Sequence, residues 1–161
     1  MNSRSVFLSR PVLVAAALVL QAVLLVVAVA PQLSARVTGL EYRLAVGPVD
    51  PIDPLRGAYA QLNYPGLPNA DGQRPGRVYV PLVRDDRLWK GAGIVRQRPA
   101  SAPYIACESS GYGRLSCGID SLFLSQDKAA RVQDELAGDR TAAIVKIDAN
   151  GNAAVVGLAP R

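Results

Sequence analysis

The longest uninterrupted apolar stretch of the chain lies near the N-terminus, from Val12 to Ala30, and Gln21 is its only polar side chain. At about 1.5 Å per residue, a helix of this length spans about 28 Å, close to the hydrocarbon thickness of a bilayer. A helix also satisfies every backbone amide inside the lipid. We therefore predict a transmembrane helix over 12–30 that contacts membrane lipid. Pro11 suits a first helical turn, and we expect Pro31 to end the helix, because proline disrupts a helix interior.

The same stretch has an alternative interpretation as a cleaved signal peptide. Its last residues, Ala28-Val29-Ala30, have the small-x-small form of a cleavage site. Two features argue for an uncleaved anchor instead. The apolar run is longer than the core of a typical signal peptide, and Pro31 fits poorly at the position after a cut. We expect the anchor to be retained.

The orientation of the anchor depends on the basic residues that flank it. Arg4 and Arg10 precede the span, while Arg36 and Arg43 follow it, so the arginine tally is nearly balanced. The N-terminal amine and the short leading segment favour the N-inside orientation. We expect residues 1–11 in the cytoplasm and residues 31–161 outside it, attached to a bacterial inner membrane as a single-pass protein.

Beyond the span, alternating apolar and polar positions predict short strands. Leu40, Tyr42, Leu44 and Val46 alternate within the first of them, which is predicted over 36–46. Further strands are predicted over 59–64, 77–83, 88–97, 104–107 and 115–124, and two more flank the turn signal Asn150-Gly151. Pro81 predicts an edge position or a bulge for its strand. A short helix is predicted over 126–137, so the fold class is mainly β (α+β), a small antiparallel domain with one short helix.

The two cysteines, Cys107 and Cys117, stand in the segment CESSGYGRLSC. Gly111 and Gly113 between them favour a turn, so we expect the flanking strands to form the two arms of a hairpin. A disulfide is stable outside the cytoplasm, and we expect one here. The alternative is a pair of free thiols in the core.

The chain has 18 basic and 13 acidic residues and no histidine. Histidine-based triads and histidine metal ligands are therefore excluded, and we expect neither a metal nor a cofactor. The basic residues are densest between positions 74 and 98, a segment that contains seven bases and two acids. These bases are Arg74, Arg77, Arg84, Arg87, Lys90, Arg96 and Arg98. They predict either a solvated strand face or a site for an anionic envelope ligand or lipid headgroups. Nucleic acid is not expected outside the cytoplasm.

The segment VDPIDPLRGAYAQLNY, from Val49 to Tyr64, is the most specific stretch of the chain. Proline holds the residue before it in an extended or turn conformation, so both Asp-Pro pairs predict a rigid corner that leads into a strand. On that strand Leu62 and Tyr64 share one face. The alternative is a binding surface made by Asp50, Asp53, Arg56 and Tyr59.

This segment resembles the signature of the membrane-anchored GDYXXLXY family. Nine positions match the family pattern: Asp50, Pro51, Asp53, Pro54, Arg56, Gly57, Tyr59, Leu62 and Tyr64. The segments RVYVPLV, CGIDSLFLSQ and AAIVKIDANGNAAVVGL resemble the family in outline. Ala58 stands where the motif has aspartate, and Gln126 stands where relatives tend to have an acid. The resemblance carries no established activity. It implies a small anchored protein of the kind encoded near multi-span membrane proteins.

We therefore expect an accessory protein, without chemistry of its own, whose β domain binds a multi-span membrane protein. A serine-lysine hydrolase is the less favoured alternative, because Lys90, Lys128 and Lys146 are the only lysines and no serine has a recognisable nucleophile context. We expect Arg56 to pair with a nearby acid such as Asp53 or Asp120.

Overall fold

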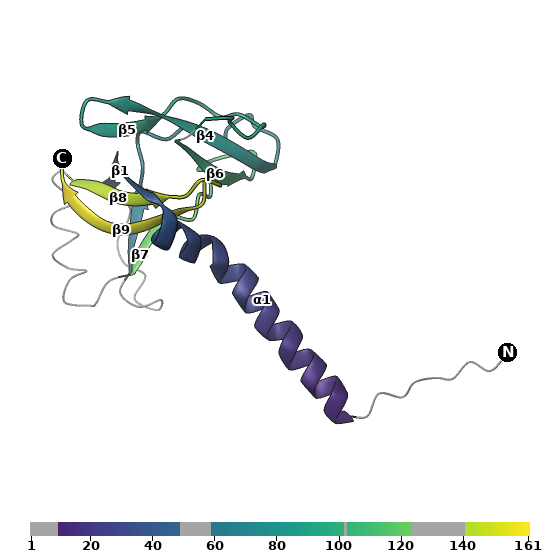
Figure 1. Cartoon of the computed structure of the whole chain (residues 1–161). Coiled ribbons are helices and arrows are strands. Elements are labelled where there is room, and N and C mark those ends of the chain that lie inside the picture. Colours follow the sequence, from purple (N-terminus) through teal and green to yellow (C-terminus); the bar gives the residue numbers. More distant parts are fainter. Residues whose placement is uncertain (1–9, 49–58, 102, 124–140) are drawn as a thin grey trace. The chain divides into compact units, whose positions relative to one another are not determined.

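The computed structural model describes residues 10–48, 59–101, 103–123 and 141–161 (Figure 1). The chain forms two compact units, Met1–Pro31 and Gln32–Arg161. The short helix predicted over 126–137 lies outside the described residues.

The N-terminal helix α1 runs from Arg10 to Thr38. From Pro11 to Thr38 it is long and apolar enough to cross a membrane. The prediction that Pro31 ends the helix is wrong, because Pro31 lies inside α1. The predicted strand beginning near Arg36 is correspondingly shorter, since residues 36–38 are helical.

Contacts within the second unit explain why the helix continues past Pro31. Proline removes one backbone hydrogen bond from a helix, at a cost of about 3 kcal/mol. Ala35 is fully buried in the second unit. Gln32 Nε2 donates to the carbonyl oxygen of Gly118 at 2.8 Å, and Ser34 Oγ donates to Asp148 Oδ2 at 2.5 Å. These contacts hold the last two turns in helical conformation and offset the loss at Pro31.

The remaining described elements are strands, so the prediction of a mainly β domain is confirmed. The strands are β1 (Leu40–Ala45), β2 (Gly47–Pro48), β3 (Tyr59–Asn63), β4 (Gly76–Asp85), β5 (Leu88–Gly91), β6 (Tyr104–Ser109), β7 (Ser121–Phe123), β8 (Thr141–Ile147) and β9 (Ala153–Pro160). Six form a sheet in the order β6-β4-β5-β1-β8-β9, and three form a second sheet in the order β2-β3-β7 (Figure 1).

One apolar core joins the two sheets. Its fully buried side chains include Leu62 of β3, Val78 of β4 and Ile105 of β6, together with Val145 of β8. The strand pairs are antiparallel except for β1 and β5, which pair in parallel at Leu44 and Trp89. The expected purely antiparallel arrangement is therefore corrected at one pair. A parallel pair needs a long connection, and the chain between β1 and β5 supplies one.

Pro81 was predicted to mark an edge position or a bulge, and the edge position is wrong because its strand is interior. β4 has β6 on one side and β5 on the other. Residues 76–81 pair with β6 and residues 82–85 pair with β5. Pro81 is the last position of the first pairing, and its carbonyl oxygen accepts from Ala92 N at 2.8 Å. The missing amide of proline thus falls where β4 changes partners, and the ladder tolerates it.

The two segments that carry the cysteines do not form a regular hairpin, which corrects the prediction that they are its two arms. They pair only at Glu108 and Ser116, whose backbone groups exchange hydrogen bonds of 2.8 and 3.0 Å. The chain then leaves the large sheet, and β7 pairs with β3 in the small one. The second arm therefore crosses from one sheet to the other.

The turn between β8 and β9 confirms the hairpin predicted from Asn150-Gly151. Gly151 has φ +78°, a conformation that favours glycine. The carboxylate of Asp148 organises the turn. Its Oδ1 accepts from the backbone amides of Asn150 and Asn152 at 2.8 and 3.0 Å, and its Oδ2 accepts from Asn152 Nδ2 at 2.8 Å. Since Oδ2 also accepts from Ser34, the turn holds the end of α1.

The stability of this turn should depend on pH. Burial raises the pKa of Asp148, but the hydrogen bonds from Ser34, Asn152 and Asn150 outweigh it and hold the pKa below its ordinary value. A pKa lowered by folding stabilises the protein above the unfolded value of about 3.9, and this stabilisation is lost as the pH falls through the folded value. We expect Asp148→Asn to lower the free energy of unfolding by about 1.5 kcal/mol at neutral pH.

The measurement is the Tm of both proteins in detergent between neutral pH and a pH of about 3. The difference in Tm between the unaltered chain and Asp148→Asn should shrink as the pH falls. Asp86→Asn is the matched control, because Asp86 is exposed and asparagine tolerates its φ of +55°. A difference that stays constant over the whole range would contradict the role given to the Asp148 charge.

Candidate functional site

The motif strand β3 and the residue that follows it direct two side chains into the domain. Leu62 is 1% exposed and Tyr64 is 8% exposed. Leu62 N donates to the carbonyl oxygen of Asp120 at 2.9 Å. Tyr64 Oη donates to the carbonyl oxygen of Ile119 at 2.9 Å. The motif therefore binds the backbone of the segment 117–120 through both its main chain and its terminal tyrosine.

A disulfide fixes the other end of this segment. Cys117 is bonded to Cys107 of β6, with an S–S distance of 2.10 Å and Cα atoms 4.2 Å apart. The prediction of this disulfide is confirmed. Segment 117–120 is thus tied covalently to the large sheet and by hydrogen bonds to β3 of the small sheet.

We expect the disulfide to be detectable in native membranes. Without reductant, a maleimide reagent should label neither cysteine, even after denaturation with detergent. After reduction it should label both, since the chain has 2 cysteines. The gel shift of the chain with a polyethylene glycol maleimide measures this. Labelling of both thiols before reduction would show that the bond is absent.

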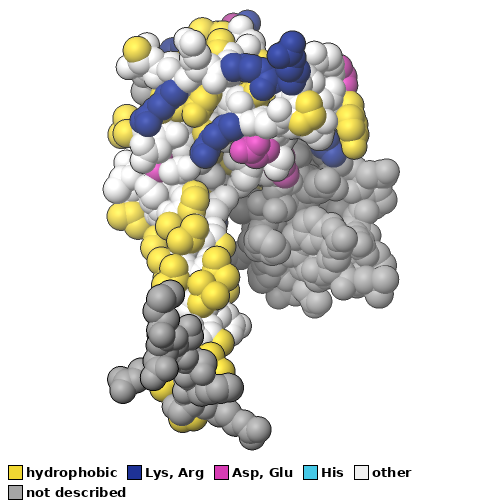
Figure 2. All heavy atoms as spheres, turned by 90° about the vertical axis from the view of Figure 1, so that its right-hand side faces the viewer, with side chains coloured by type: hydrophobic (Ala, Val, Ile, Leu, Met, Phe, Trp, Pro, Cys, Tyr) yellow, Lys and Arg dark blue, Asp and Glu magenta, His cyan; other side chains and the backbone are white. Residues whose placement is uncertain are grey.

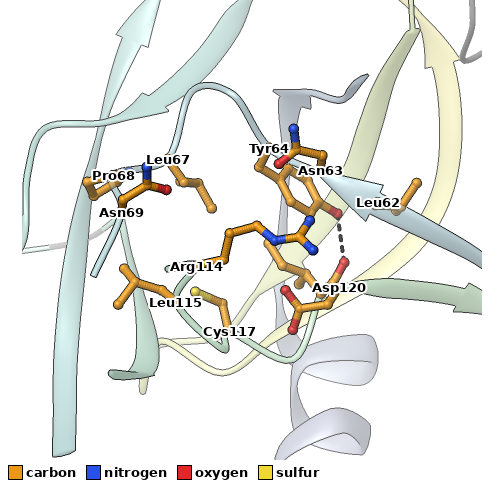
Figure 3. A pocket seen from close by; sticks show the side chains of 11 residues that line it. Leu62, Asn63, Tyr64, Leu67, Pro68, Asn69, Arg114, Leu115, Cys117 and Asp120 are labelled. Atoms are coloured by element: carbon orange, nitrogen blue, oxygen red, sulfur yellow. Dashed lines mark hydrogen bonds between the residues drawn. The ribbon is translucent and has the colours of Figure 1, made fainter. Parts of the chain in front are cut away.

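A small cleft opens beside the motif strand (Figure 3). Its volume is about 30 Å³, which suits one or two water molecules. The lining residues come from three segments: Leu62, Asn63, Tyr64, Leu67, Pro68 and Asn69 from β3 and the chain after it, Arg114 and Leu115 from between the cysteines, and Cys117, Ile119 and Asp120. The cleft is too small for an organic substrate.

Burial dominates the electrostatics of the cleft. It raises the pKa of Asp120, although backbone hydrogen bonds at Cys117 and the charge of Arg114 act in the opposite direction. Burial, and then the charge of Asp120, raise the pKa of Tyr64 far above its ordinary value. Tyr64 is therefore a neutral phenol at any physiological pH, and its hydroxyl group donates its hydrogen bond to the carbonyl oxygen of Ile119.

The cleft offers one carboxyl group, one guanidinium and two amides, which can orient water or a small polar group of a partner. Among the described residues, no group of three or more histidine, cysteine, aspartate or glutamate side chains is placed to hold a metal ion.

Of the nine motif positions, six lie outside the described residues: Asp50, Pro51, Asp53, Pro54, Arg56 and Gly57. Tyr59 begins β3 and pairs with Phe123 of β7. The structure brings Leu62 and Tyr64 together with Asp120, which the sequence suggested only as a partner of Arg56. Sequence reasoning missed Arg114 and Asn69. The available signal was the disulfide, because Arg114 is the only base between the two cysteines and bridging brings it near Asp120.

The seven bases between positions 74 and 98 are all exposed. Figure 2 shows Lys and Arg side chains spread over one face of the β domain. Some of them have local partners: Lys90 Nζ lies 3.0 Å from Asp85 Oδ2, and Arg84 Nε donates to the carbonyl oxygen of Asp86 at 3.0 Å. These contacts are those of a solvated surface and contribute little to stability.

Arg98 differs from the other bases because it holds the β8–β9 turn. Its Nε donates to Tyr104 Oη at 2.6 Å, and its Nη2 donates to the carbonyl oxygen of Ala149 at 2.8 Å. The guanidinium also lies over the Tyr104 ring, 5.8 Å from its centroid. Arg98 therefore serves the fold.

The structure defines a class of protein: a mainly β, disulfide-bonded domain that follows a helix long and apolar enough to span a membrane. The family model described as GDYXXLXY protein matches residues 21–158. The chain therefore belongs to the GDYXXLXY family, as the motif indicated. Comparison with curated proteins and with solved structures gives no match.

Proposed function

We propose that this chain is a membrane-anchored accessory protein whose β domain lies outside the cytoplasm. Three observations support this. Helix α1 has the length and composition of a membrane span. Arg4, Arg10 and the N-terminal amine stand in the short segment before the apolar run 12–30, and together they favour a cytoplasmic N-terminus in a bacterial inner membrane. The domain after it carries a disulfide, which persists in an oxidising compartment.

In this proposal the β domain binds a multi-span membrane protein and catalyses no reaction itself. The observation that supports this proposal best is that the described motif residues serve the fold. Leu62 and Tyr64 are buried and bonded to the backbone of 119–120, and the adjacent cleft has room only for water. The described part of the family motif thus builds the domain. The exposed surface of the domain then remains for contact with a partner.

Affinity purification of the full chain from native membranes in mild detergent tests this proposal. We expect a multi-span protein to co-purify in stoichiometric amount and to be identified by mass spectrometry. The matched variant replaces residues 12–30 by an unrelated membrane span. If it retains the partner, the β domain makes the contact. Purification of the chain alone, at unchanged yield, would overturn the accessory function.

Protease protection in sealed membrane vesicles tests the orientation. In right-side-out vesicles we expect added protease to reach the β domain, whereas in inverted vesicles the domain should be protected. Because the two preparations differ only in sidedness, a reversed pattern would place the domain in the cytoplasm and contradict the proposed topology.

A second candidate function is binding of an anionic envelope ligand through the basic segment. The exposed side chains of Arg74, Arg77, Arg87 and Arg96 favour it. Binding of polyphosphate to the full chain in detergent should weaken as salt rises, and Arg77→Gln with Arg87→Gln should weaken it further. Arg43→Gln, an exposed arginine outside the segment, is the matched control. Equal binding by both variants would overturn this candidate.

A further inference from the structure

Three large apolar side chains stand exposed where α1 ends and β1 begins. Leu33 is 56% exposed, Val37 is 72% exposed and Leu40 is 69% exposed. We refer to these three residues as the Leu33 patch. Within the unit Gln32–Arg161 they fall within eight residues of one another, while the other exposed large apolar residues, Val83, Val95, Tyr112 and Val156, are separated along the chain. Leu33 and Val37 are also four residues apart on one helix and so lie on the same side of it. Neighbouring exposed apolar side chains mark an interaction surface.

The helix itself directs the patch away from the β domain. Successive residues of an α-helix are turned by about 100°, so Leu33 and Val37 each lie about 160° from Ala35 around the axis. Ala35 is fully buried in the domain, and Gln32 is bonded to Gly118. The side of the helix that carries Leu33 and Val37 is therefore the side opposite to the domain.

The distance along the helix places this side at the level of lipid headgroups. If residues 12–30 fill the hydrocarbon, Leu33 lies about 4.5 Å beyond Ala30 and Val37 about 10.5 Å beyond it. The headgroup layer extends about 5–8 Å beyond the hydrocarbon on each side. Side chains on a helix also tilt towards its N-terminus, which here is towards the span. Both side chains can thus reach the layer.

The charges around the Leu33 patch also suit the lipid headgroup layer. Arg36 lies on the helix between Leu33 and Val37, and its side chain is exposed. Lys146 Nζ donates to the carbonyl oxygen of Arg36 at 3.3 Å, so a second cation stands beside the end of α1. Glu41 pairs with Lys146 across the strands and offsets part of this charge. Cations beside apolar side chains are typical of surfaces that bind lipid phosphates.

We infer that the Leu33 patch is a membrane-surface contact that inserts into the headgroup layer of the bilayer that α1 spans. The inference rests on the anchor of the proposed function, and it is independent of any protein partner. It commits to lipid because Leu33 follows the apolar run 12–30 on the same helix by less than one turn, at the depth where the hydrocarbon of the bilayer ends.

Tryptophan placed in the full chain tests the inference. The chain is reconstituted in phosphatidylcholine–phosphatidylglycerol vesicles whose acyl chains are brominated either near the headgroup or near the methyl end. The signal of the unaltered chain, due to Trp89 alone, is subtracted. Leu33→Trp is the test variant, Leu20→Trp reports on the middle of the span, and Val83→Trp reports on an exposed position of β4 that is 41% exposed.

The tryptophan of Leu33→Trp should lose most of its added fluorescence to bromine near the headgroup and little to bromine near the methyl end. Leu20→Trp should show the reverse order, and Val83→Trp should lose nothing in either lipid. Val37→Trp replaces Leu33→Trp if the latter does not fold.

Two results would overturn the inference while leaving the anchor intact, provided that Leu20→Trp is quenched. Blue-shifted emission without quenching at Leu33→Trp would show that protein, a partner or a second copy, covers the patch. Emission at long wavelength without quenching would show that water covers it. If Leu20→Trp is not quenched in either lipid, the anchor itself fails, and the inference fails with it.

Discussion

Replacement of Leu62 by alanine is expected to lower the free energy of unfolding of the β domain by about 3 kcal/mol. Leu62 is 1% exposed and belongs to the single core that joins the two sheets. Truncation removes buried methyl groups and leaves a cavity. The walls of this cavity cannot close easily, because the backbone on either side is held by the hydrogen bond to Asp120 and by the disulfide at Cys117.

Denaturant unfolding of the full chain in detergent, followed by Trp89 fluorescence, measures this loss. Val83→Ala is the matched control, because Val83 is 41% exposed and its truncation should change the free energy of unfolding by less than about 0.5 kcal/mol. If the Leu62 motif position serves the fold, partner binding by Leu62→Ala should fall only in proportion to the unfolded fraction. A fully folded variant that lost its partner would show that the motif acts in recognition instead.

The elements that the sequence predicted well are those encoded by neighbouring residues. The alternation from Leu40 to Val46 predicted β1, and Leu44 of this strand is buried as expected, whereas Leu40 at its start is 69% exposed. Asn150-Gly151 predicted the β8–β9 turn, since a positive φ is a local requirement. The cysteine pair predicted the disulfide, because a chain with 2 cysteines offers each of them one partner.

The elements that were predicted wrongly depend on partners distant in the sequence. Pro31 is tolerated inside α1 because Ser34 and Ala35, which follow it, contact the β domain. Asp148, which accepts the hydrogen bond from Ser34, is 114 residues further along the chain. Pro81 is tolerated in an interior strand because β4 changes neighbours there. Neither fact is visible in local propensity, because a tertiary contact decides each case.

The candidate site likewise has one part that the sequence predicted and one part that it did not. The common face of Leu62 and Tyr64 follows from the two-residue period of a strand, and the structure places both inside the domain. The cleft beside them also needs Arg114 and Asn69, which arrive through the disulfide loop and the chain after β3. An isolated bridge between Asn69 and Arg114 brings these two segments together. No periodic pattern indicates such a bridge.

The junction between α1 and the β domain is expected to depend on Gly39. A Cβ atom at this position would press on the carbonyl oxygen of Ala35 and would lie 2.8 Å from the backbone nitrogen of Ile147 in β8. Both neighbours are backbone atoms held in hydrogen-bonded structure, so neither can move aside cheaply. Gly39 N also donates to the oxygen of Ala35 at 3.0 Å, which closes the last turn of the helix. We expect Gly39→Ala to lower the free energy of unfolding by about 3 kcal/mol, at the upper end for overpacking.

Gly47→Ala is the matched control, because among the described residues nothing lies within 4 Å of a Cβ atom built there. It should change the free energy of unfolding by less than about 0.5 kcal/mol in the same denaturant experiment. Hydrogen exchange separates the effect on the junction from a general loss of stability. In Gly39→Ala the amides of residues 35–40 should exchange faster, at a denaturant concentration where the amides of β4 and β6 remain protected. Equal protection and stability in the two variants would mean that the end of the helix does not pack on β8, and the contacts of Gln32 and Ser34 would then need another explanation.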